Sequence, residues 1–230
     1  MWGVPTTTIT LDEAVDLTRT GDVWLFRGSS VPDRAIRIAT NSPVNHVGMS
    51  VVIEDLPALM WHAELGKSLR DHWTGTYQRG VQLHDLREAV LVWARRYGQR
   101  AWLRQLKTPV TTEMENAVLR TIARLDGTPF PSTARLAWRW LRGRVPDLRT
   151  GFFASDASDR DASDRDAPPP DARLETAYCA EVVAVTYEAM GLLPDHRHPN
   201  WYDPGRFWSG DDLRLEAGAE LGEEIAVTIP

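Results

Sequence analysis

Short, mainly apolar runs separated by polar turns fill the first hundred residues of the chain. Residues 46–53 and 59–65 are two such runs, and the turn Glu54-Asp55-Leu56-Pro57 between them predicts a β-hairpin. Runs of this length are typical of buried strands. We therefore expect further strands at residues 23–26, 81–83 and 90–94.

Helical patterns with recognisable ends occur mainly in the second half of the chain. Residues 112–125 form one such pattern, in which the side chain of Thr111 or Thr112 suits an N-cap and Gly127 is a natural stop. Residues 177–190 follow Thr176 and end at Gly191, which predicts a second helix. Shorter helices are expected at residues 11–17, 32–40 and 132–141.

Residues 154–171 interrupt this pattern. The pentad Ala-Ser-Asp-Arg-Asp occurs there twice in tandem, and three prolines follow it. Such a polar, charged segment has no apolar surface to bury, so it predicts a disordered insertion or a surface loop. We interpret residues 1–230 as a single domain that carries this insertion, because the earlier strands need the later helix to cover them.

The charge of the chain is unevenly distributed. The net charge is −6, yet residues 95–149 are strongly basic and contain Trp138 and Trp140 beside several arginines. A basic, tryptophan-containing helix can make peripheral contact with an anionic membrane, although a solvated helix face is the simpler reading. No nucleic-acid motif accompanies the basic stretch, so we do not expect nucleic acid as a partner.

The sequence shows no signal peptide and no membrane-spanning run, which predicts a cytoplasmic protein.

Cys179 is the only cysteine and falls in the first turn of the predicted helix 177–190. The helix dipole and the free N–H groups there favour a thiolate, but a small buried side chain is the more common role for a lone cysteine near a helix start. A thiol nucleophile needs a base, and His46 opens the first hairpin strand. His62 and Glu64 share a face of the second strand, from which Glu64 could hold the His46 ring.

Four segments, taken in their order along the chain, resemble the circularly permuted branch of the NlpC/P60 papain-like superfamily. The YiiX-like proteins are the most similar group, and lecithin retinol acyltransferase-like proteins are more distant relatives. The resemblance covers most of residues 15–210 outside the insertion. The segments that carry it are Gly21-Asp22-Val23-Trp24-Leu25-Phe26, Asn45-His46-Val47-Gly48-Met49, His62-Ala63-Glu64 and Tyr178-Cys179-Ala180-Glu181-Val182-Val183.

The resemblance implies an α+β fold in which an antiparallel, barrel-like sheet packs against the Cys-bearing helix. It makes Cys179 the nucleophile, His46 the general base, and Glu64 the third polar group, with His62 as a competitor for that position. Tyr178 and His62 would line the substrate pocket. The implied reaction is cleavage of an amide or ester through a thioester acyl-enzyme, without a cofactor or metal. A cell-wall peptide or a lipid would be the substrate, and hydrolysis is favoured over acyl transfer.

Two other functions fit the same residues. His46, His62 and Glu64, together with His196 or His198, could form the site of a metal-dependent hydrolase. Alternatively, the chain could be a non-catalytic ligand-binding module on the same fold, because ten tryptophans offer ample material for a ligand groove.

Overall fold

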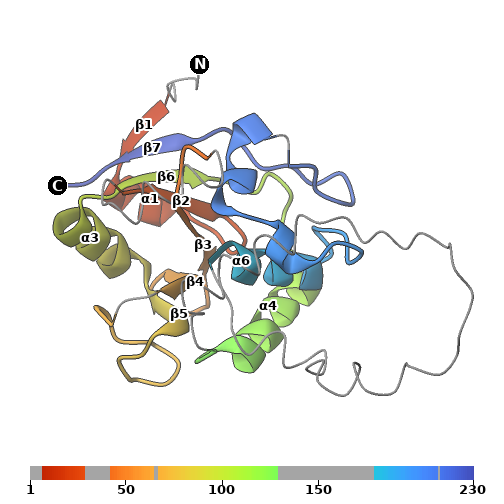
Figure 1. The fold of residues 1–230 in the computed structure, drawn as a ribbon, viewed down its shortest axis with the longest axis horizontal. Helices are drawn as coiled ribbons and strands as arrows, with labels where there is room; N and C mark the ends of the chain where they lie inside the picture. Colours follow the sequence, from red (N-terminus) through yellow and green to blue (C-terminus); the bar gives the residue numbers. More distant parts are fainter. Residues whose placement is uncertain (1–6, 29–41, 65–66, 129–178, 212) are drawn as a thin grey trace, which may run out of the picture.

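The computed structural model describes residues 7–28, 42–64, 67–128, 179–211 and 213–230. These residues form one mixed α/β arrangement around a seven-stranded sheet with the order β1-β7-β6-β2-β3-β4-β5 (Figure 1). Every neighbouring pair is antiparallel except β1 and β7, which run parallel. The strands are β1 (Thr7–Thr10), β2 (Val23–Arg27), β3 (His46–Val51), β4 (Leu59–Glu64), β5 (Gly80–Asp85), β6 (Arg100–Arg104) and β7 (Ile225–Thr228).

The hairpin predicted from the first apolar runs is confirmed. β3 and β4 pair with Met49 opposite Trp61, and Asp55 takes a positive φ of 68° in the turn between them. The strands predicted at residues 23–26 and 81–83 correspond to β2 and β5. These runs form strands because both of their faces are buried, which suits continuous apolar sequence.

Three predicted helices are present where their caps indicate. Thr10 and Thr111 accept the N–H of the third residue of α1 (Leu11–Leu17) and α4 (Thr112–Leu125), respectively. The third helix is α6 (Cys179–Ala189), and Gly191 follows it with a positive φ of 73°. The predictions for Thr176, residues 32–40, residues 132–141 and the insertion 154–171 fall outside the described residues.

The strand predicted at residues 90–94 is wrong, because this segment belongs to α3 (Leu86–Tyr97). Asp85 caps the helix by accepting the N–H of Glu88 at 2.7 Å, and Gly98 ends it in the left-handed region with φ 62°. The buried side chains recur at helical spacing, at Leu86, Ala89, Val90 and Trp93. β1, β6 and β7 were not anticipated from the sequence.

Helices cover both faces of the sheet, as Figure 1 shows with α6 and α3 on opposite sides. α6 and α4 pack on the face formed by Val47, Met49 and Trp61, whereas α1 and α3 pack on the face formed by Trp24, Phe26 and Met60. The sheet is open, with β1 and β5 at its edges, so the expected barrel-like closure is absent from the described strands. None of the helices in the described ranges is both long and apolar enough to cross a membrane.

The Gly21-Asp22 pair has a structural role at the start of β2. The Asp22 carboxylate is fully buried and accepts the N–H of Leu106 and the N–H of Arg19, each at 2.8 Å. It thereby ties the end of β6 to the loop before β2. Burial of this carboxyl raises its pKa to about 6, against the lowering effect of these hydrogen bonds.

Candidate functional site

Three histidine rings from three adjacent strands form a hydrogen-bonded chain. The Nε2 atom of His46 lies 3.2 Å from Nδ1 of His62, and Nε2 of His62 lies 3.0 Å from Nδ1 of His84. The chain ends at Gln82, whose Oε1 lies 3.1 Å from Nε2 of His84. We call these four side chains the histidine relay.

The strand register brings the relay together. His46, His62 and His84 belong to β3, β4 and β5, and their rings lie on the sheet face that α3 covers, where Trp93 contacts the rings of His46 and His62. His62 is paired with Gln82 across the β4–β5 ladder. Gly48 makes room for the close approach, because a Cβ there would lie 2.5 Å from Sδ of Met60 and 3.3 Å from Cβ of His62.

Gln82 sets the direction of the hydrogen bonds. Its Nε2 donates to the carbonyl of Gly80 at 3.4 Å, which leaves Oε1, an acceptor only, facing His84. His84 must therefore donate from Nε2 and accept at Nδ1 from His62. His62 in turn accepts at Nδ1 from Nε2 of His46. This order leaves Nδ1 of His46 with a free lone pair, as a base requires.

The relay histidines are neutral at physiological pH. Burial lowers the pKa of His46 to about 4 and that of His84 to about 4. Burial, reinforced by the charges of its two histidine neighbours, holds the pKa of His62 well below its usual value. Each ring therefore carries one proton, which is the state that the hydrogen-bond order requires.

Glu64 lies beside the relay but not against His46. Its Oε1 accepts the hydroxyl of Ser68 at 3.0 Å, and its Oε2 lies 3.9 Å from Nδ1 of His84. Burial raises the pKa of this carboxyl. The side chain hydrogen-bonded to the His46 ring is thus His62, one of the two candidates for the orienting position.

His62, Glu64 and His84 could hold a metal ion. One ligand atom from each lies within 4.8 Å of the other two. The Oε2 atom of Glu64 accepts no hydrogen bond from the described residues, so this carboxylate oxygen could serve as a metal ligand. His46 does not belong to this group, and His196 lines a separate pocket.

Cys179 is the first residue of α6 and is only 3% exposed. Its sulfur accepts the backbone N–H of Val47, the residue after His46. Val47 lies beyond Met49 and Trp61, the last partners of the β3–β4 ladder, so the thiol lies where the two strands separate. The indole of Trp61 donates to the hydroxyl of Thr186 at 3.0 Å and fixes α6 against β4.

The thiol and the His46 ring are neighbours along β3 but are not in contact. No hydrogen bond joins these two described residues, since the ring packs against Phe26 and Trp93 while Cys179 belongs to the apolar core beneath α6. Burial raises the pKa of the thiol to about 12, and the nearby charge of Asp203 adds to this. Both groups are therefore neutral, unlike the thiolate and imidazolium that the helix start suggests. Tyr178 lies outside the described residues.

His84 and Gln82 are the members of the site that sequence reasoning missed. The alternation in Val81-Gln82-Leu83-His84 places both polar side chains on one face of a strand, which was an available signal. The pairing of β5 with β4, however, depends on contacts that the sequence pattern does not specify.

Comparison with known proteins gives similarity at the level of structure. No family model matches the chain, and no curated protein matches it. The solved structure of the metalloprotein YiiX from Escherichia coli O157:H7 aligns with 74% of this chain at 19% identity, with a TM-score of 0.44. The chain spans 65% of the length of YiiX, which is less than two thirds.

Proposed function

We propose that this protein is a cysteine-dependent hydrolase of the permuted NlpC/P60 type, with Cys179 as nucleophile and His46 as general base. One observation carries the proposal. The Cys179 sulfur accepts a hydrogen bond from the N–H of Val47, where the strands that bear His46 and His62 separate. The relay supports the proposal further, because its hydrogen-bond order leaves Nδ1 of His46 as a free base.

The protonation states favour general-base catalysis over a preformed ion pair. In the proposed reaction, Nδ1 of His46 removes the thiol proton as the sulfur attacks the carbonyl carbon of an amide or ester. Nε2–H of His46 donates to His62 and so stabilises the imidazolium that forms. His46 then returns the proton to the leaving amine or alcohol. Water attacks the thioester, releases the acid and restores the thiol.

Substrate binding would have to bring the ring and the thiol together. Catalytic hydrogen bonds are often long or absent in an unliganded site and tighten only in the substrate complex. His46 precedes Val47 directly, but its ring lies on the α3 face of the sheet and the thiol on the α6 face, so the ring would have to move around the start of β3. The acyl donor that we propose is a cell-wall peptide or a lipid, and the acceptor is water, with acyl transfer as the variant.

Intact-mass measurement after exposure to activated acyl esters tests this proposal. We expect one acyl adduct per chain, lost in Cys179→Ser and formed about 10²-fold more slowly in His46→Asn. His72→Asn changes an exposed histidine outside the relay and serves as the matched control. Absence of any adduct on Cys179 of the wild type, or full labelling of Cys179→Ser, would contradict the proposal.

A second candidate is a metal-dependent hydrolase that uses His62, Glu64 and His84. The close spacing of their ligand atoms favours it, as does the lack of a hydrogen bond to Oε2 of Glu64 from the described residues. The two functions exclude each other at His84, since its Nδ1 cannot accept the His62 hydrogen bond and bind a metal at once. Elemental analysis of the purified protein separates them. A stoichiometric metal that is lost in His84→Ala, with activity lost on chelation and kept in Cys179→Ser, would replace the cysteine proposal.

A further inference from the structure

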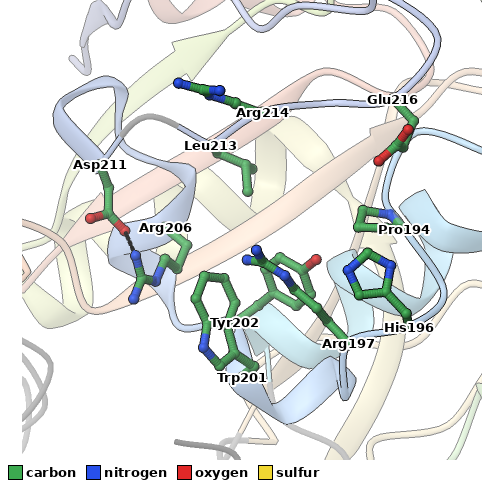
Figure 2. A pocket seen from close by; sticks show the side chains of 10 residues that line it. All are labelled: Pro194, His196, Arg197, Trp201, Tyr202, Arg206, Asp211, Leu213, Arg214 and Glu216. Carbon is green, nitrogen blue, oxygen red and sulfur yellow. Dashed lines mark ion pairs between the residues drawn. The ribbon is translucent and has the colours of Figure 1, made fainter. Parts of the chain in front are cut away.

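A pocket of about 430 Å³ lies between the segment that follows α6 and the loop that leads toward β7. Figure 2 shows Arg197, Trp201, Tyr202 and Arg206 on one side of it, with Leu213 and Glu216 across from them. We call it the arginine pocket. It is separate from the relay, and neither the sequence patterns nor the proposed hydrolase gives it a role.

Tyr202 is the first sign that the pocket binds a ligand. The residue is only 1% exposed, yet its hydroxyl makes no hydrogen bond to any described residue. Buried tyrosine hydroxyls usually find a partner, so an unused hydroxyl at a pocket wall is a free binding group. Burial raises the pKa of Tyr202 to about 12, so the hydroxyl remains a donor at neutral pH.

The cationic side of the pocket is built around Trp201. The guanidinium carbon of Arg197 lies 4.5 Å from the Trp201 ring centroid and that of Arg206 lies 4.1 Å from it. Arg206 is neutralised by Asp211 at 2.9 Å, but Arg197 forms no ion pair within the described residues. One guanidinium of the pair is therefore available to an anionic group.

The opposite side supplies the opposite charge. The carboxylate of Glu216 makes no ion pair or side-chain hydrogen bond with the part of the chain that the structure describes. The charges of Glu188 and, less strongly, Glu216 raise the pKa of the Tyr202 hydroxyl, whereas those of Arg197 and Arg206 lower it, so the hydroxyl is within reach of both signs of charge. A simple anion would satisfy Arg197 and face an uncompensated carboxylate, whereas a molecule with both charges satisfies both.

We propose that the arginine pocket binds a zwitterion of the amino-acid or dipeptide class. The ligand's carboxylate accepts hydrogen bonds from Arg197 and from the Tyr202 hydroxyl, and its ammonium group pairs with Glu216. Its apolar part packs against Trp201 and Leu213. Arginine is suited to the carboxylate because its planar fork donates two parallel hydrogen bonds.

Calorimetric titration of the full chain tests the pocket without any need for turnover, so its outcome is independent of the proposed hydrolase. The probes are alanylalanine, N-acetylalanylalanine, alanylalanine amide and inorganic phosphate. We expect saturable binding of alanylalanine, with affinity at least tenfold lower for each of the other three. Equal binding of phosphate, or no binding of the dipeptide, would overturn the proposal.

Three variants assign the contacts. Arg197→Gln and Glu216→Gln should each weaken alanylalanine binding at least tenfold, while Arg120→Gln, an exposed arginine on α4, leaves it unchanged. Tyr202→Phe removes only the hydroxyl, which no described residue uses, so we expect an unchanged Tm and at least threefold weaker binding. Wild-type affinity in both Arg197→Gln and Tyr202→Phe would place the dipeptide elsewhere and overturn the assignment.

Discussion

The Nε2 atom of His46 lies 3.2 Å from the Nδ1 atom of His62. These residues come from neighbouring strands, and the contact fixes both the orientation and the tautomer of the His46 ring. The proposed base is therefore held by another histidine instead of a carboxylate, and that histidine is itself held by His84 and Gln82. An arrangement of neutral groups avoids burying a net charge beside Trp93.

If the relay orients His46, then removing the acceptor on His62 should cost activity more than stability. His62→Phe keeps a ring of similar size but deletes Nδ1, and we expect kcat toward an activated ester to fall about 10²-fold or more. Ser68→Ala, which removes a hydroxyl bonded to Glu64 outside the relay, is the control. A folded His62→Phe variant with wild-type kcat would exclude an orienting role for His62.

The buried thiol should react slowly with alkylating agents. With the pKa of Cys179 raised to about 12, the thiolate fraction still grows tenfold per pH unit at pH 9, far from its plateau. We expect iodoacetamide to modify the native protein at pH 8 at least about 10²-fold more slowly than the chain in denaturant. Because Cys179 is the only cysteine, mass spectrometry reports this site alone. A rate that reaches its plateau below pH 8 in the native protein would show an ionised thiol instead.

Gly48 should be difficult to replace, because an added Cβ would meet Met60 and His62 in a closely packed region. We expect Gly48→Ala to lower the free energy of unfolding by about 1–3 kcal/mol, as overpacking of a core does. Gly222→Ala adds the same methyl group where its nearest neighbour would be the Gln105 carbonyl oxygen at 3.4 Å, and it should change little. Urea unfolding of both variants checks the difference, and equal stabilities would mean that the strands adjust without cost.

Asp22 should make stability fall as pH rises through the mildly acidic range. Its native pKa of about 6 exceeds the ordinary value of 3.8, so the native state binds the proton more tightly between these pH values. The free energy of unfolding then decreases as pH rises from about 4 to 6, by up to about 3 kcal/mol from this group.

Urea unfolding at pH 4.5 and pH 7 measures this effect of Asp22. The loss over that interval should be smaller in Asp22→Asn, whereas Asp16→Asn, a change at an exposed position of α1, should follow the wild type. Parallel pH profiles for the wild type and Asp22→Asn would show that Asp22 has no part in the pH dependence.

Elements with local signals were predictable, and those that depend on distant contacts were not. The β3–β4 hairpin follows from two apolar runs and the turn at Asp55, and α4 follows from its cap at Thr111. The strand prediction for residues 90–94 was wrong because Val-Leu-Val is typical of a strand. The caps at Asp85 and Gly98, which bound the helix α3, lie outside that run. Strand β7 carries only a short apolar run and owes its place to pairing with β1 and β6.

The candidate site was predictable only in part for the same reason. His46, His62, Glu64 and Cys179 stood out by residue type and order, and the hairpin brought the first three onto one face. The contact of His62 with His84 depends on the β4–β5 register, and the burial that raises the thiol pKa depends on how α6 packs. Neither the strand register nor the helix packing is determined by the residues next to the site in the sequence. The protonation states of the histidines and the thiol could therefore not be predicted.

The position of β7 between β1 and β6 has a consequence for synthesis of the chain. On the ribosome β1 emerges first and β7 last, yet among the described strands β1 pairs only with β7. Until residues 225–228 have been made, β6 remains a bare edge and the first strand has no place to dock. The nascent protein must therefore carry these unpaired backbone groups until β7 has been made, and open strand edges invite misassembly during that interval.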